Sequence, residues 1–350
     1  MAKLRGHLIY FSAILGILTQ PGLLTAYCQT ANPQSASPAA EAQSLLDHGR
    51  VDEALKALNA LASVQPEPAG VERLRGMAYY EQGQMQPSLQ AFQSALVQDP
   101  ADREAMQMEG VTFFLTGKPA LAIPLLEKAH LSIPANNVDN NYVLGLCYLD
   151  TQRYDDARRA FATQYSFLPD SPPAYLLTAR MMLRRDYLPM AETFAQKALT
   201  LNPALPMAHF LLGQIRLARL QLPEAVAEFE HERDLNPLFG EVYDRLGDCY
   251  LRQGDYPNAQ EALDQAVLLE PNSPVPLVLL GKVLLKQQDL SMAQKYLVKA
   301  LAMDPRNYVG HTLLGQVYRS LGEADKASRE FQLVEQIQAT TKPKVESSLK

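Results

Sequence analysis

Tryptophan is absent from this 350-residue sequence, and cysteine occurs only three times. No segment reaches the roughly 18 consecutive apolar residues that an ordinary transmembrane helix needs. The formal net charge is −6, and the lysines and arginines are scattered along the chain. Binding to nucleic acid requires a basic stripe that neutralises phosphates, so we expect no nucleic-acid partner.

Motifs that carry catalysis are also missing. The sequence contains no H-E-x-x-H, G-x-S-x-G or C-x-x-C pattern. The Gly-Lys pair at Gly117 and Lys118 is followed by Pro119, where a phosphate-binding loop needs Ser or Thr. We therefore predict no catalytic residue, no metal site and no small-molecule cofactor, and expect that the chain is not an enzyme.

The N-terminus differs from the rest of the chain. Lys3 and Arg5 precede an apolar run over residues 8–18, and small residues follow. This order is typical of a secretory signal peptide over residues 1–28. It predicts an exported protein, periplasmic or extracellular, with an uncleaved membrane anchor over residues 8–27 as the alternative and the only expected membrane contact. The sequence leaves three cleavage positions open: Ala26, Cys28 and Ala31.

Residues 29–40 are rich in Pro, Ala, Ser and Gln and predict a flexible spacer, and residues 342–350 form a polar tail. Between them the prolines recur every 34 or 35 residues. This ladder consists of Pro66, Pro100, Pro134, Pro169, Pro203, Pro237, Pro271 and Pro305. A fixed period of this length indicates stacked structural repeats over residues 41–341.

Two more ladders share the period. One consists of Gly76, Gly110, Gly145, Ala179, Gly213, Gly247, Gly281 and Gly315, and the other of small residues such as Ala225 and Ala259. Two helices approach closely only where neither carries a large side chain, so each unit is predicted to be a helix pair that crosses at these positions. A large apolar residue four positions after the second small one, such as Phe229, lies on the same helix face. Gly49, Gly83, Gly117, Gly254 and Gly322 fall where the first helix must end in a left-handed cap.

These residues resemble the tetratricopeptide repeat, a 34-residue pattern of W-x2-L-G-x2-Y, A-x3-F and P. Tyr243 to Pro271 is the clearest copy. The resemblance implies an all-α fold, an α-solenoid that winds antiparallel helix pairs into a right-handed superhelix. In its frame we number nine units: 35–68, 69–102, 103–136, 138–171, 172–205, 206–239, 240–273, 274–307 and 308–341. His209 and His311 share the position where the family often has Trp, so packing is expected for them rather than metal binding.

The resemblance also implies a concave groove lined by the first helices. Its groove positions correspond to Tyr142, Leu176 and Phe210, with Val111, Phe114 and Leu146 nearby. Two basic pairs, Arg180 with Arg184 and Lys282 with Lys286, would attract acidic residues of a partner. The alternative is that the apolar residues pack between units and the charges are simply solvated.

Cys147 and Cys249 occupy one repeat position in units three apart, beyond disulfide reach, and we expect them to be small buried residues. The sequence thus predicts an exported, non-catalytic scaffold that binds a peptide or a partner protein in its groove. The alternative is an accessory subunit of an envelope assembly, secretion or polymer-synthesis enzyme complex.

Overall fold

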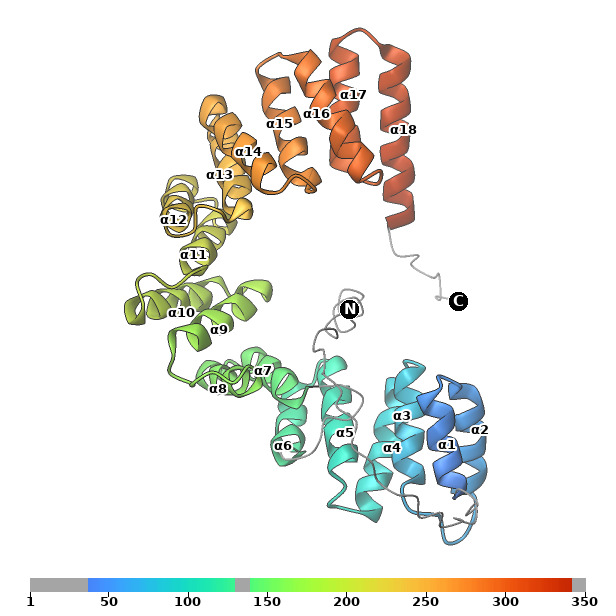
Figure 1. The fold of residues 1–350 in the computed structure, drawn as a ribbon. Helices are drawn as coiled ribbons and strands as arrows, with labels where there is room; N and C mark the ends of the chain where they lie inside the picture. The colour runs from blue at the N-terminus through green and yellow to red at the C-terminus, as the bar shows by residue number, and fades with distance from the viewer. Residues whose placement is uncertain (1–36, 130–138, 342–350) are drawn as a thin grey trace, which may run out of the picture.

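The computed structural model describes residues 37–129 and 139–341. Within these residues the chain folds into eighteen α-helices and no strand, arranged as successive antiparallel pairs along an open arc (Figure 1). The predicted α-solenoid is therefore confirmed. The expected signal peptide and polar tail lie outside the described residues.

The helices of the first five units are α1 Pro38–Asp47, α2 Val51–Ala62, α3 Val71–Glu81, α4 Met85–Gln98, α5 Arg103–Leu115, α6 Pro119–Ala129, α7 Asn140–Asp150, α8 Tyr154–Gln164, α9 Pro172–Arg184 and α10 Leu188–Leu201. Those of the last four units are α11 Ala208–Ala218, α12 Leu222–Leu235, α13 Gly240–Gln253, α14 Tyr256–Leu269, α15 Pro274–Lys286, α16 Leu290–Met303, α17 Tyr308–Ser320 and α18 Ala324–Thr341. Each unit of the sequence frame holds one pair.

One boundary differs from the expectation. Helix α1 begins at Pro38, inside the spacer predicted for residues 29–40. The Ser37 side chain accepts a hydrogen bond from the backbone N–H of Ala40, and Pro38 has the backbone dihedral that a first helical turn requires. Local capping therefore extends the array by three residues.

The turn inside every unit adopts the same left-handed backbone conformation. The residue that ends the first helix has a φ between 59° and 81° in all nine units. Five units have the predicted glycine there, and four have a side chain instead: Gln152, Asp186, Leu220 and Gln288. A left-handed residue other than glycine costs roughly 1–2 kcal/mol, so these four turns are strained.

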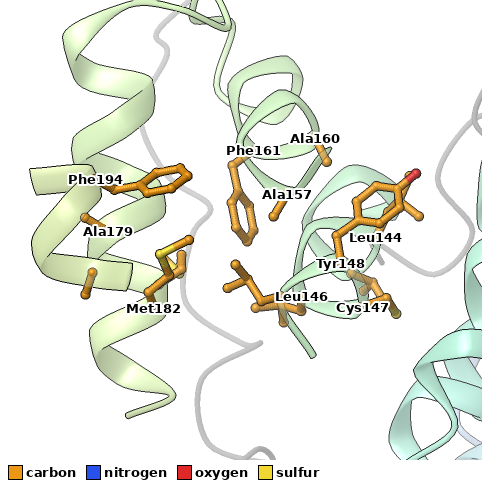
Figure 2. Packing of buried hydrophobic residues seen from close by; sticks show 14 of the residues in the cluster. Leu144, Leu146, Cys147, Tyr148, Ala157, Ala160, Phe161, Ala179, Met182 and Phe194 are labelled. Carbon is orange, nitrogen blue, oxygen red and sulfur yellow. The ribbon is translucent and has the colours of Figure 1, made fainter. Parts of the chain in front are cut away.

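In seven of the nine units, a glycine of the first helix packs against a large side chain of the second. A Cβ atom added to Gly145 in α7 would lie 2.6 Å from the Phe161 ring of α8, and one added to Gly213 in α11 would lie 2.5 Å from the Phe229 ring of α12. Figure 2 shows the Phe161 ring pointing from α8 toward Leu146 of α7, among buried side chains of two units. The two helices can lie this close only because the glycines have no side chain.

The fifth unit has small residues at both positions of the helix crossing. Its first helix has Ala179 in place of glycine, and its second helix has Ala195 in place of the large residue, both fully buried. In the first unit, Ala42 stands at the glycine position opposite Leu58, and both residues are fully buried.

First helices of neighbouring units contact one another, for example α9 with α11 and α13 with α15. Since successive elements of a curved stack come closest on its inner side, the first helices line the concave face of the arc (Figure 1). Contacts between neighbouring first helices are weakest at α7 with α9 and at α11 with α13. The concave face is therefore most open there.

Among the described residues, no helix combines the length and apolarity that crossing a membrane requires.

Candidate functional site

An apolar pocket of about 360 Å³ lies on the first helices of units 5, 6 and 7. Side chains of α9 and α11 form most of its lining, and residues at the helix ends complete it. The lining residues are Phe167, Pro173, Leu176, Leu177, Arg180, Leu205, Pro206, Met207, Phe210, Leu211, Gln214 and Glu241. We call it the apolar pocket. It lies beside the weak contact between α11 and α13.

A second, more open pocket of about 670 Å³ adjoins the first and has a basic lining. Arg180 and Gln214 line both pockets, so the two surfaces are continuous. Its other charged residues are Arg184, Arg245 and Arg252. We call it the arginine pocket.

The four arginines differ in how they are paired. Arg245 donates a hydrogen bond to Glu241 at 3.0 Å, and Arg252 donates one to Asp248 at 2.9 Å. Arg180 and Arg184 are exposed and have no ion-pair partner among residues 37–129 and 139–341. Two guanidinium groups next to an apolar pocket are therefore available to carboxylates of a ligand.

The turn residue Leu220 also lines the arginine pocket. Its side chain is 73% exposed, and its φ of 59° lies in the left-handed region. Both properties are unfavourable for leucine in a stable turn, and five other units have glycine at this position. Strain of this kind is often retained where a side chain has a function.

The structure brings together only some of the residues that the sequence suggested. Leu176, Phe210 and Arg180 line the apolar pocket, and Arg184 lines the arginine pocket. Phe210 is only 4% exposed, so it forms the wall of the pocket and part of the core. Its ring packs against Phe229 and against Phe239, which directly precedes α13, with centroids 5.6 and 5.0 Å apart.

The remaining candidates lie elsewhere. Val111 and Leu146 are buried in the core between units, as the packing alternative proposed. Phe114 is half-buried under the Arg185 guanidinium, and Tyr142 contacts the Phe161 ring. The basic pair Lys282 and Lys286 lies on α15 and lines neither pocket.

Of the residues expected in the groove, Leu176, Phe210, Arg180 and Arg184 line the two pockets, which lie over units 5 to 7. Sequence reasoning missed Phe167, Leu205, Arg245 and Arg252, which come from helix ends and from a unit beyond the expected stretch. The loop residues carry no periodic signal. Arg245 could have been found, because it lies one period beyond Leu211 on the next first helix.

The cysteine and histidine predictions also have structural outcomes. Cys147 and Cys249 are free and fully buried, and burial raises the pKa of each thiol to about 12. His209 and His311 form equivalent contacts within their helix pairs, their Nδ1 atoms lying 2.7 and 2.6 Å from glutamate oxygens. The described residues contain no group of three His, Cys, Asp or Glu side chains placed to hold a metal ion.

Sequence profiles of known families agree with this geometry. Two profiles described as tetratricopeptide repeat match residues 39–103, 74–140 and 278–340, and residues 240–273. Together they cover more than half of the chain. The chain belongs to the tetratricopeptide repeat family. No curated protein sequence matches it significantly.

Solved structures of tetratricopeptide repeat type are similar to the chain at low sequence identity. The Cut9–Hcn1 hetero-tetramer is 18% identical with a TM-score of 0.44, and the match covers 82% of this chain but only 57% of that one. YrrB, described as having an unusual peptide-binding site, is 20% identical with a TM-score of 0.44 and coverages of 53% and 95%. MamA from Desulfovibrio magneticus RS-1 is 20% identical with a TM-score of 0.46 and coverages of 50% and 98%.

Proposed function

We propose that this tetratricopeptide repeat protein is an exported, non-catalytic scaffold that binds an extended segment of a partner protein across the first helices of units 5 to 7. The observation that carries the proposal is the continuity of the apolar pocket with the arginine pocket through Arg180 and Gln214. A repeat array offers long concave surfaces of this kind for peptides.

The two pockets divide the work of recognition. A pocket of about 360 Å³ lined by Leu176, Leu177 and Phe210 accepts an apolar side chain, whose burial contributes roughly 1.5–3 kcal/mol. Arg180 and Arg184 then attract carboxylates that follow on the same segment, which favours fast association and fixes the direction of binding. Leu220 adds an exposed apolar contact at the far edge.

Export is proposed from the sequence of the N-terminus. Lys3 and Arg5 before an apolar run have the order of a secretory signal. Fractionation of cells that express the full chain with a C-terminal tag tests this part separately. A tagged chain found only in the cytosol, at its full-length mass, would contradict it.

Site-specific photo-crosslinking tests the binding surface. A photoreactive phenylalanine analogue at Gln214, which lines both pockets, is compared with the same residue at Val298, exposed on the second helix α16. We expect adducts with a distinct partner from position 214 and none from position 298, and Arg180→Glu together with Arg184→Glu should reduce the adducts. The same adducts from both positions would refute the proposed surface.

A further inference from the structure

A third pocket, of about 390 Å³, lies between α13 and α15 and has an acidic lining. Glu241, Asp244 and Asp248 of α13 line it together with Glu270, the C-cap residue of α14, and Arg245 also lines the pocket. Glu241 lines the apolar pocket too, so the acidic pocket adjoins it in unit 7.

Asp244 is the unusual member of this group. Its side chain is 7% exposed, and its Oδ1 atom is buried without a hydrogen-bond partner. It lies one 34-residue period after Phe210, at the position where units 4, 5, 6 and 8 have Tyr142, Leu176, Phe210 and Val278. A carboxylate thus replaces the apolar residue of that row, although an unpaired buried carboxylate destabilises a fold.

Only part of the negative charge in the acidic pocket is neutralised within the protein. Arg245 donates to Glu241, and Asp248 accepts from Arg252, so neither Asp244 nor Glu270 forms an ion pair among the described residues. The charge of Arg245 lowers the pKa of Asp244 only in part. Burial, together with the Glu270 charge, raises the pKa of Asp244 to about 7. A cation from outside the chain would relieve both effects.

The backbone makes room for the second free carboxylate. A Cβ atom added to Gly240, the first residue of α13, would lie 2.5 Å from Cγ and 2.6 Å from Oε1 of Glu270. Units 5, 6 and 8 have Pro172, Pro206 and Pro274 at the position of Gly240. The glycine therefore allows Glu270 to lie against α13, beside Asp244.

We propose that the acidic pocket binds a lysine or arginine side chain of the same partner segment whose apolar residue occupies the apolar pocket, an inference that rests on the proposed function. The pocket is far larger than a single ion, and Val275 and Leu279 in its lining would contact the methylene groups of a long basic side chain. The preferred ligand thus carries an apolar residue, acidic residues and a basic residue, one kind for each of the three adjoining pockets.

Selection from a library of random peptides displayed on phage tests this ligand pattern. The selections use the wild type, Asp244→Asn with Glu270→Gln, and the control Glu261→Gln with Glu335→Gln. The control removes equal charge at two exposed glutamates that line none of the three pockets. We expect the wild type and the control to select a basic residue at a fixed distance from an apolar one. The Asp244→Asn, Glu270→Gln variant should keep the apolar preference and lose the basic one.

The affinities of one selected peptide and of its analogue with alanine in place of the basic residue measure how much the basic residue contributes to binding. The alanine analogue should bind the wild type about tenfold more weakly, and the Asp244→Asn, Glu270→Gln variant less than about twofold more weakly. Apolar selection without a basic preference would overturn the acidic pocket and leave the proposed function standing. If nothing is selected, the proposed function fails as well. If calcium or magnesium ions abolish the basic preference, the pocket is a metal site and the inference is wrong.

Discussion

Replacing Gly213 in α11 with alanine puts a methyl group into the space that the Phe229 ring of α12 occupies. The new Cβ would lie 2.5 Å from one ring carbon and less than 3 Å from two others, and the ring is fully buried. Overpacking of this kind costs about 1 to 3 kcal/mol, while the better helix propensity of alanine returns about 1 kcal/mol. We therefore expect Gly213→Ala to lower the free energy of unfolding by about 1 kcal/mol.

Substitution of Phe229 tests whether its ring causes the loss of stability in Gly213→Ala. Phe229→Ala alone should cost about 3 to 5 kcal/mol, because it leaves a cavity. In that background the Gly213→Ala methyl group has space, so it should stabilise the chain by about 1 kcal/mol. The resulting coupling energy of about 2 kcal/mol lies within the range of directly contacting residues. The double variant recreates the pair that unit 5 has naturally, Ala179 with Ala195.

Urea unfolding followed by circular dichroism gives the free energies, and hydrogen exchange of the α11 and α12 amides locates the change, since repeat arrays can unfold unit by unit. Ala179→Gly is the matched control. It should cost about 1 kcal/mol, and the cost should stay the same when Ala195 is varied to serine. A coupling energy within about 0.5 kcal/mol of zero between Gly213 and Phe229 would refute the packing argument.

Three further predictions concern the site and the core. Asp244→Asn should become more stable relative to the wild type as the pH rises from about 4 to about 8. An unfolded aspartate ionises near pH 4, whereas the pKa of Asp244 in the folded chain is raised to about 7, so the wild type loses stability over this range. Equal pH profiles of the two proteins in denaturation would contradict this. Leu220→Gly and Gln288→Gly should each stabilise the chain by about 1 kcal/mol in denaturation assays, because glycine removes the left-handed strain. Only Leu220→Gly should weaken partner binding, and loss of binding in both variants would show that the turn conformation matters rather than the side chain. Burial raises the pKa of the Cys147 and Cys249 thiols to about 12, so both should resist labelling by a maleimide at neutral pH until urea is added. Mass spectrometry would detect the label, and labelling of the native protein would mean that these units open.

The repeat frame could be predicted because its signals are local and recur. A proline stop, a small residue at the helix crossing and a glycine cap each depend on the backbone of one unit, and the same residues appear in nearly every copy. The structure confirms all five glycine caps and extends the same φ to Gln152, Asp186, Leu220 and Gln288. The period places those four at the glycine position, but only Asp186 is of a residue type that adopts this conformation comparatively readily.

The site was harder to predict because exposure depends on the next unit. Leu176 and Phe210 share a repeat position, yet Leu176 is half-buried whereas Phe210 is nearly covered. The Phe239 ring lies in the loop between α12 and α13, with its centroid 5.0 Å from that of Phe210, and the period does not encode this contact. The opening between α11 and α13 likewise results from how neighbouring helices stack. A repeat pattern thus locates a residue on its helix but does not determine which neighbouring side chains cover it.

The paired choice of glycine with a large residue, or alanine with alanine, sets rules for exchanging parts of this array. Whole units such as unit 4 and unit 6 carry compatible pairs and could be swapped as blocks with respect to this crossing. A single helix of unit 5 could not: α9 with Ala179 in place of α11 would meet the Phe229 ring, and α10 with Ala195 in place of α12 would leave a hole beside Gly213. For protein engineers, unit 5 is therefore interchangeable only as a whole helix pair.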